Sequence, residues 1–494
     1  MSSKKILAID LGASSGRLMQ AIYNGKSLQL SEVHRFKNES VNINDGLYWD
    51  ILYLFQEIKV GIKKATLDEI PIESISVDTW GVDYGFIDQH GDLLYNPHCY
   101  RDNRMGCYEE QFYSIVSKEE LFSRTGVQPN LINTIMQIYA DLQVNPYLRQ
   151  VVKHVLFTPD LINYLLSDTV ANEYTIASTS GLLDIHTQDW AVDLLNKLEI
   201  PVEWFLPVTK RGKQLRTLSP RITQELKIEP FSVITGAGHD TAAAVLAVPY
   251  EDKAHSAFIS SGTWSLVGVE STTPVVTSQA LEAGVTNEGC FTGDYRILKN
   301  TTGLWILQEL RRDWLLKGED ISFADMVVLA QNVEEISCFI NPNDEWFSTP
   351  NNMEDKIKQY CQRSNQPIPV TKGEIIRIVL ESLAFSYRQT VEQIECLSNR
   401  SIQTIHMVGG GIQNKLLCQL TANHTGRKVI AGPVEASAMG NILSQLLTLN
   451  KIETLEEIVT LVKASDTTTV YEPIDNETID VKYEQYKKIV KVGE

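Results

Sequence analysis

Two hydrophobic patterns interleave along the chain, and together they predict an α/β protein. Short apolar runs between turn-forming residues are typical of buried strands, and apolar residues three and four positions apart are typical of helices. The expected strands are 5–9, 18–23, 74–79, 231–235, 295–300, 405–408 and 428–432. The expected helices are 51–64, 134–144, 158–166, 188–197, 242–248, 303–310, 373–396 and 435–447. Strands and helices that alternate in this way indicate the α/β class.

Two segments share one design, in which an apolar strand, a turn of small polar residues and a second apolar strand form a hairpin. The first spans Lys5–Tyr23 with its turn at Asp10–Arg17, and the second spans Ala254–Val269 with its turn at Ser260–Thr263. Such turns present free backbone amides that can cradle phosphates, although the local sequence taken alone slightly favours a plain hairpin with an unusually polar turn. The repeat predicts two related half-domains that face one another across a cleft.

The segment GAGHDTA, Gly236–Ala242, follows an apolar strand and precedes an apolar helix. Its glycines would let the backbone approach a ligand, and a helix start offers unpaired N–H groups that suit anions. Asp240 would then stand beside the bound group, placed to take a proton. The alternative is that Asp240 only caps the helix, since aspartate is a favoured capping residue.

Two further segments suggest binding. Trp80-Gly81 lies beside two aspartates and could stack on and hydrogen-bond a sugar, or the tryptophan could belong to the core. The triple glycine at 409–411 lies between a strand and a helix, as in many nucleotide sites of α/β folds. The patterns GxGxxG and GxxxxGK[ST] are absent, which disfavours a Rossmann dehydrogenase or a P-loop enzyme.

Composition narrows the functional classes. The 494 residues suffice for roughly three domains and large cores, and 43% hydrophobic with 21% charged residues is ordinary for a globular protein. The net charge of −18 argues against a nucleic-acid partner. Seven scattered cysteines without a C-x-x-C pair indicate neither a disulfide framework nor a structural zinc site. No apolar run is long enough to span a membrane, so we expect a cytoplasmic protein.

Read in order, these segments resemble one known family. DLGASSGR, DTWGVDYGF, YRDNR, GHDTA, SSGTWSL, LKNTTGLWILQ, FINPND, VGGGIQN and AGPVEASAMGN together are similar to motifs of the FGGY carbohydrate kinases, over about residues 6 to 445. The resemblance implies two actin-like (ribonuclease H-like) domains facing a central cleft. It places sugar binding, the first phosphate loop and the catalytic aspartate in residues 1–248. It places nucleotide binding in 249–494. The tail after about 447 is partly helical and charged in pattern, and we expect it to pack back on the first domain.

The resemblance also implies roles for individual residues. Asp240 corresponds to the catalytic base and Asp10 to the carboxylate that contacts Mg²⁺. The residues matched to phosphate and nucleotide are Ala13, Ser14, Ser15, Gly16, Arg17, Thr263, Gln308 and Gly410. The residues matched to the sugar are Gly81, His239, Asp240, Thr241 and Asn300.

The implied activity is ATP-dependent phosphorylation of a ketose at its primary hydroxyl, and inside the family the motifs match kinases that make L-rhamnulose 1-phosphate from L-rhamnulose. ATP, Mg²⁺ and a small ketose are the expected cofactors and partners, while the oligomeric state is left open. The alternatives are another ketose kinase of the family, for L-fuculose or xylulose, and a catalytically silent sensor on the same fold.

Overall fold

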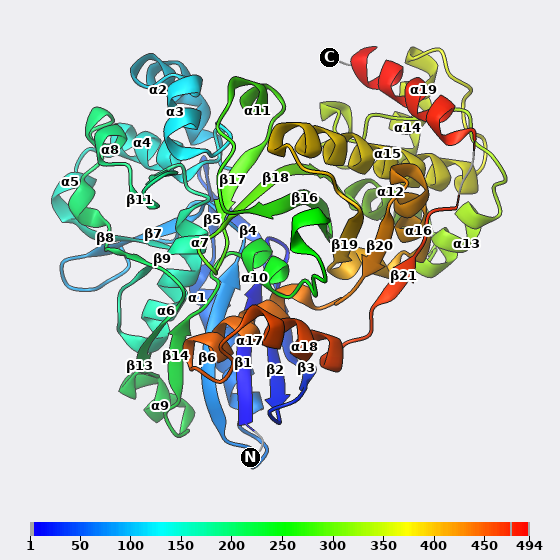
Figure 1. Cartoon of the computed structure of the whole chain (residues 1–494). Coiled ribbons are helices and arrows are strands. Elements are labelled where there is room, and N and C mark those ends of the chain that lie inside the picture. Colours follow the sequence, from blue (N-terminus) through cyan, green and yellow to red (C-terminus); the bar gives the residue numbers. More distant parts are fainter. Residues whose placement is uncertain (1–3, 475–476, 493–494) are drawn as a thin grey trace. The chain divides into compact units, whose positions relative to one another are not determined.

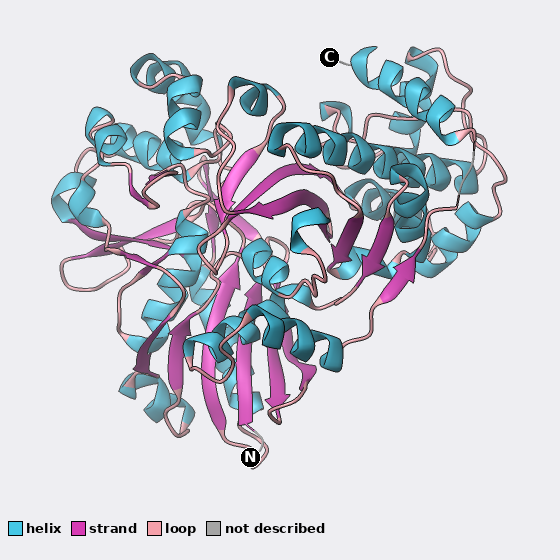
Figure 2. Cartoon of the chain, viewed as in Figure 1, coloured by secondary structure: helices cyan, strands magenta, loops and turns pink. Residues whose placement is uncertain are grey.

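A computed structural model describes residues 4–474 and 477–492 of the chain (Figures 1 and 2). The chain forms two compact units. The first unit contains residues 1–249, 270–297 and 436–465, and the second contains residues 250–269, 298–435 and 466–494. Helices and strands interleave through both, which confirms the α/β class.

The first unit consists of short strands and helices that alternate along the described part of the chain. Its strands are β1 (Lys4–Leu11), β2 (Ser15–Tyr23), β3 (Leu28–Lys37), β4 (Ser40–Ile43), β5 (Gly46–Trp49), β6 (Ile72–Thr79), β7 (Tyr84–Asp88), β8 (Val152–Phe157), β9 (Asn172–Glu173), β10 (Leu183–Asp184), β11 (Asp189–Trp190), β12 (Val208–Thr209), β13 (Lys213–Thr217), β14 (Ser232–Thr235) and β17 (Thr286–Gly289). Its helices are α1 (Ile51–Ala65), α2 (Glu109–Ile115), α3 (Lys118–Thr125), α4 (Thr134–Val144), α5 (Leu148–Val151), α6 (Thr158–Ser167), α7 (Tyr174–Ala177), α8 (Val192–Lys197), α9 (Pro220–Leu226), α10 (Asp240–Leu246), α11 (Ser278–Glu282), α17 (Ala436–Thr448) and α18 (Leu455–Ser465).

The main sheet of the first unit has the order β13-β14-β6-β1-β2-β3. Strands β1, β6 and β14 are parallel, whereas β2, β3 and β13 are antiparallel to their neighbours. One face of the sheet is apolar: Leu7, Ile9, Ile75 and Val77 join the buried core that also contains residues of α1 and α6. The expected hairpin is confirmed, with a turn shorter than predicted because Asp10 already pairs with Arg17.

The other face of strand β6 carries polar residues, and helix α17 covers it. Ser74 donates to Gln445 at 2.7 Å, and Asn441 donates to Asp78 at 2.7 Å. Gln445 also donates to the carbonyl of Leu7 at 2.8 Å. A helix from residues 436–448 therefore completes the hydrogen bonding of a sheet built from the start of the chain, as Figure 1 shows for α17 beside β1 and β6.

The second unit is built on a sheet of the overall order β17-β18-β16-β15-β19-β20-β21. Its strands are β15 (Ser256–Ser261), β16 (Trp264–Ser271), β18 (Tyr295–Thr302), β19 (Thr404–Val408), β20 (Lys428–Ala431) and β21 (Thr469–Tyr471), of which β16 and β18 continue into the first unit. Its helices are α12 (Trp305–Leu316), α13 (Phe323–Gln331), α14 (Met353–Arg363), α15 (Lys372–Ser398), α16 (Lys415–Thr425) and α19 (Ile479–Val492).

The two sheets repeat one topology. In the first unit β2-β1-β6-β14-β13 are joined by antiparallel, parallel, parallel and antiparallel pairings. In the second unit β16-β15-β19-β20-β21 are joined by the same four kinds of pairing in the same order. The repeat of the hairpin design in the sequence therefore extends to whole sheets.

Three sequence expectations differ from the observed elements. The helix expected over 188–197 begins only at Val192, because Asp189–Trp190 form the short strand β11. The triple glycine opens a 3-10 turn, Gly410–Gln413, before α16 begins at Lys415. After residue 447 the tail contributes to both units: α18 packs on β3 in the first unit, whereas β21 and α19 belong to the second.

No helix in the described part of the chain has the length and apolar character needed to cross a membrane.

Candidate active site

The carboxyl ends of the parallel strands of the first unit bring distant sequence segments together. In the register of β1 and β6, Asp10 is the partner of Asp78. Beyond the end of β14, the N–H of Thr79 donates to the carbonyl of Gly238 at 2.9 Å, and Thr79 pairs with His239. Because parallel strands end at one edge of a sheet, three segments with polar side chains meet there.

Asp240 is the first residue of helix α10, and His239 takes the capping position. One carboxylate oxygen of Asp240, Oδ1, accepts from the backbone N–H of Thr241 at 2.5 Å and from its hydroxyl at 3.1 Å. The Nε2 atom of His239 lies 3.4 Å from the same oxygen. For Oδ2 of Asp240 no hydrogen bond to a described residue is found, and the side chain keeps 33% exposure. The two oxygens therefore differ: one is held and the other is able to accept a proton.

The electrostatic surroundings favour a proton on Asp240. Burial raises the pKa of Asp240, the nearby His239 opposes that rise, and Asp10 adds to it. Burial lowers the pKa of His239, which keeps its imidazole neutral, although Glu288 and Asp240 oppose this. A carboxylate with a raised pKa is a better proton acceptor than an ordinary one.

Glu173 fastens the segment that carries His239 and Asp240. Its buried carboxylate accepts from the N–H groups of Thr175 at 2.8 Å, Ile176 at 3.0 Å and Gly238 at 3.1 Å. The hydroxyl of Thr175 in turn accepts from the N–H of His239 at 3.1 Å. Burial raises the pKa of Glu173 to about 7.

The glycines of this segment admit protein side chains and not a ligand, contrary to our expectation. A Cβ on Gly236 would lie 2.3 Å from the hydroxyl of Ser444, and one on Gly238 would lie 2.9 Å from a carboxylate oxygen of Glu173. Glycine is needed here because helix α17 and Glu173 approach the backbone closely.

The turn between β1 and β2 lies at the same edge as Asp240. Arg17 Nη2 donates to Asp10 Oδ2 at 2.5 Å, so the positively charged guanidinium of Arg17 lies directly beside the carboxylate that is predicted to contact Mg²⁺. Asn38 fixes the turn through its side-chain N–H on the carbonyl of Gly12 at 2.8 Å and its backbone N–H on that of Ser14 at 3.1 Å. Ser14 is exposed at the tip, while Gly16 is buried against Phe36.

Trp80 is not the exposed stacking residue that was one of two interpretations, since it is only 6% exposed. Its ring lies 4.5 Å from that of Trp49, and the indole N–H groups of both tryptophans donate to Asp83 Oδ2, at 2.8 and 2.6 Å. Gln137 donates to the other oxygen at 3.1 Å. Asp83 is thus the buried centre of a polar cluster that holds Trp80. Its pKa is raised by burial to about 6.

The second unit gathers its own group of predicted residues. Thr263, in the turn between β15 and β16, contacts the Gln308 side chain at 3.2 Å. A Cβ on Gly411 would lie 2.1 Å from the Ser261 hydroxyl, which shows that the triple glycine packs on this same turn. Gly410 has open space where a Cβ would be, so it is the glycine of the three that is accessible to a ligand. Asn300 is exposed on β18 in the second unit.

The structure therefore groups the predicted residues in two sets. Asp10, the turn Ala13–Arg17, Gly81 and His239–Thr241 lie in the first unit, and Thr263, Gln308, Gly410 and Asn300 lie in the second. Within the described part of the chain no group of three or more histidine, cysteine, aspartate or glutamate side chains is arranged to hold a metal.

Sequence reasoning missed the residues that support Asp240 and Trp80. The segment Gly238–Asp240 is contacted by three charged residues that lie 49 or more positions away in the sequence, and no local pattern marks them: Glu173, Glu288 and Arg296. Asp83 could have been found from the sequence, because it lies three residues after Trp80 in the motif DTWGVDYGF.

Solved structures of carbohydrate kinases share this fold. The xylulose kinase of Rhodospirillum rubrum superposes with a TM-score of 0.80 at 16% identity, covering 99% of each chain. Plasmodium falciparum glycerol kinase with ADP superposes with a TM-score of 0.79 at 17% identity, covering 99% of this chain and 98% of the other. These similarities confirm the expected actin-like (ribonuclease H-like) fold.

Sequence comparisons are more specific. The chain is 37% identical over 488 residues to the rhamnulokinase of Bacteroides thetaiotaomicron, covering 99% of this chain and 100% of that protein. It is 39% identical over 459 residues to the rhamnulokinase of Oceanobacillus iheyensis, covering 93% and 96%. Residues 5–247 match the model of the N-terminal domain of the FGGY carbohydrate kinases and residues 257–449 match that of the C-terminal domain. Because both domain models match in order over most of the chain, the chain belongs to the FGGY family of carbohydrate kinases.

Proposed function

We propose that this carbohydrate kinase transfers the γ-phosphoryl group of ATP to the primary hydroxyl of L-rhamnulose, giving L-rhamnulose 1-phosphate in L-rhamnose catabolism. The observation that carries the proposal is the identity of 37–39% to proteins named rhamnulokinase over nearly the whole of both chains. The geometry around Asp240 supports the same chemistry, because it offers one free carboxylate oxygen at an accessible edge.

Asp240 is the proposed general base. As the sugar hydroxyl oxygen bonds to the γ-phosphorus, its proton passes to Asp240 Oδ2, and the bond from that phosphorus to the β–γ bridging oxygen breaks to release ADP. Phosphoryl transfer depends mostly on positioning and charge neutralisation, so one base is enough. Oδ1 stays bound to Thr241, which fixes the direction in which Oδ2 points.

Asp10 is the residue proposed to hold Mg²⁺. Magnesium in kinases is usually bound by one or two carboxylates together with phosphate oxygens and water, so a site with few protein ligands fits it. When bound, the ion neutralises the negative charge of the transferring phosphate. The turn Ala13–Arg17 and Thr263 are proposed to contact phosphates through backbone amides and hydroxyls, and Gln308 and Gly410 to lie beside the nucleotide.

Gly81, His239, Thr241 and Asn300 are proposed to contact the sugar together with Asp240. We also propose that Trp80 contacts the methyl end of the 6-deoxy sugar, although a side chain that is only 6% exposed offers little surface for this contact. The cytoplasmic location also stays a prediction.

Sugar preference tests the proposal. We expect kcat/KM at saturating Mg-ATP to be highest for L-rhamnulose, with L-fuculose, L-xylulose and D-xylulose all lower. A wrong epimer leaves buried polar groups of the site without partners, so L-fuculose should suffer although it keeps the methyl group. A sugar among the other three that matches L-rhamnulose would preserve the kinase and overturn its substrate. Absence of ADP release with every sugar would favour a silent sensor.

A further inference from the structure

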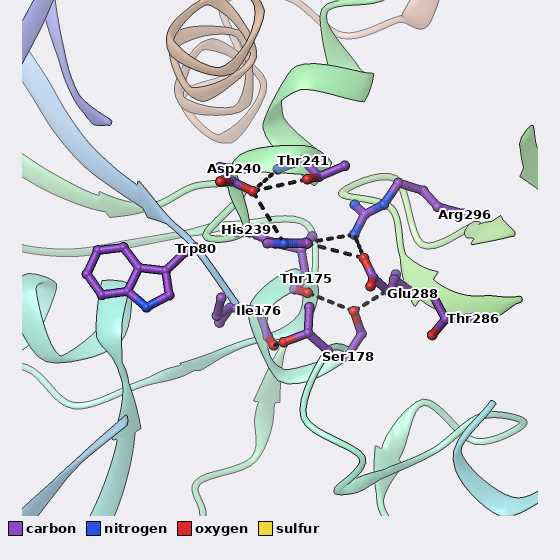
Figure 3. A network of polar contacts seen from close by, with 12 residues as sticks. Trp80, Thr175, Ile176, Ser178, His239, Asp240, Thr241, Thr286, Glu288 and Arg296 are labelled. Carbon is purple, nitrogen blue, oxygen red and sulfur yellow. Dashed lines mark hydrogen bonds and ion pairs between the residues drawn. The ribbon is translucent and has the colours of Figure 1, made fainter. Parts of the chain in front are cut away.

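His239, beside the proposed base, makes its second ring contact with a fully buried arginine. Arg296 Nη2 lies 3.0 Å from His239 Nδ1, and the same nitrogen donates to Glu288 Oε2 at 2.9 Å. The side chain of Arg296 has no exposed surface, and those of His239 and Glu288 are 8% and 9% exposed. Figure 3 shows the chain of contacts from Glu288 and Arg296 through the imidazole to Asp240.

The chemistry of arginine decides where the imidazole carries its proton. A guanidinium has only N–H donors and does not lose its charge in proteins, so a nitrogen that it contacts must accept. His239 Nδ1 is therefore the unprotonated nitrogen, and the proton of the neutral ring is on Nε2. That nitrogen lies 3.4 Å from Asp240 Oδ1.

Without the arginine the opposite tautomer would be favoured. Glu288 Oε2 lies 3.4 Å from His239 Nδ1, and a carboxylate beside a ring nitrogen attracts an N–H. The proton would then move to Nδ1, and Nε2 would present a lone pair to Asp240. Two electron-rich atoms would face each other at the base. Arg296 thus prevents Glu288 from placing the proton of His239 on Nδ1.

We propose that Arg296 is a positioning residue that fixes the Nε2–H tautomer of His239, so that an N–H and not a lone pair faces Asp240 Oδ1 at 3.4 Å while Oδ2 stays directed to the substrate hydroxyl. The proposal rests on the function proposed above for Asp240. Burial, which lowers the pKa of His239, agrees with a neutral ring that has two distinct nitrogens.

The tautomer can be measured without any enzymatic activity. In the wild type labelled with ¹⁵N-histidine, with the His239 signals assigned by their loss in His239→Gln, we expect an unprotonated Nδ1 and a protonated Nε2. In Arg296→Met, which keeps an unbranched apolar stem but removes the guanidinium donors, we expect the proton on Nδ1, bonded to Glu288. A protonated Nδ1 in the wild type overturns the proposal even if the arginine variant does not fold.

Kinetics test the consequence for Asp240. We expect Arg296→Met to lower kcat by roughly 10- to 100-fold and to leave KM for ATP unchanged. This loss is smaller than the one expected when the general base itself is removed, because the base remains in place. In a His239→Gln background, whose amide has no tautomer to fix, the same substitution should change kcat little. Equal losses in both backgrounds would overturn the proposal, as would an unchanged kcat in a folded Arg296→Met.

A matched control removes neighbouring hydrogen bonds that make no contact with the His239 ring. Ser178→Ala deletes the acceptor of the Gly289 N–H, 2.7 Å away and one residue from Glu288, and the donor to the Thr175 carbonyl at 2.7 Å. It should leave the His239 tautomer and kcat at wild-type levels, and a shift in either would show that any loosening of strand β17 disturbs the ring. A wild type with the expected tautomer but without kinase activity would reject the proposed function and not the placement of the proton.

Discussion

The two oxygens of Asp240 have different partners, and this difference separates a base from a residue that only holds a helix. Asparagine would keep the acceptor for Thr241 through its amide oxygen, so the start of α10 should be preserved. We expect Asp240→Asn to fold normally and to lose turnover by roughly 10²- to 10⁴-fold, the usual contribution of general-base catalysis. A melting curve measured beside kcat decides the matter, and near-normal turnover in the folded variant would reject the mechanism.

Asp83 is a residue whose ionisation should affect stability. Its folded-state pKa of about 6 exceeds the ordinary 3.8, so the acid form is favoured by folding. The associated stability is fully present below about pH 4 and is lost as the pH rises to about 6; a shift of roughly two units corresponds to about 3 kcal/mol. Asparagine cannot ionise and lacks this loss.

We therefore expect the stability of Asp83→Asn, relative to the wild type, to rise between pH 4 and 6 and to stay level above. Urea unfolding at a series of pH values, followed by tryptophan fluorescence, measures the difference. A constant difference across this range would show that Asp83 titrates normally. Asp45→Asn, which removes an exposed carboxylate from the surface, is the matched control for the loss of one charge.

At the scale of elements, helix α17 is the piece on which the first unit depends most. Its side chains Asn441, Ser444 and Gln445 form hydrogen bonds with polar groups of β1, β6 and the backbone N–H of Ala237. Gly440 allows it to touch helix α10, since a Cβ there would lie 1.7 Å from the carbonyl of Ala243. The helix and the segment that carries Asp240 are therefore packed as one body.

Gly440→Ala should separate α17 from α10 and destabilise the protein by about 1–3 kcal/mol, the usual cost of overpacking. The control is Gly106→Ala, where a Cβ has free space and the backbone needs no positive φ, and where stability should change by less than about 0.5 kcal/mol. Thermal unfolding of both variants checks this. Equal melting temperatures for the two would mean that α17 can shift without loss.

At the scale of the whole molecule, the predicted site residues belong to two units that each have their own sheet. We expect L-rhamnulose alone to slow hydrogen exchange around Trp80–Asp83 and His239–Thr241 in the first unit. We expect Mg-ADP to slow exchange around Ser261–Trp264 and Gly409–Ile412 in the second. Amides that contact a bound ligand exchange only when it leaves, so protection maps its position. Nucleotide protection confined to the first unit would contradict the assignment of Thr263 and Gly410.

The sequence alone determined most of the elements and the identity of the central residues. Hydrophobic periodicity is local, so the hairpin predicted at Lys5–Tyr23, the helix Thr134–Val144 and the strand before Gly236 followed from nearby residues. Motifs in a fixed order identified the family, and family resemblance supplied the candidate roles of Asp10 and Asp240.

Tertiary structure alone decided which residues surround them. Trp80 looks the same in the sequence whether it is exposed or buried, and only the contacts with Trp49 and Asp83 settle that it is buried. Asn441 and Asp78 are 363 residues apart, and Arg296 and His239 are 57 apart. Such pairs form only when strands and helices associate. That association minimises the free energy of packing and buried hydrogen bonding over the whole chain, and no local sequence pattern records it.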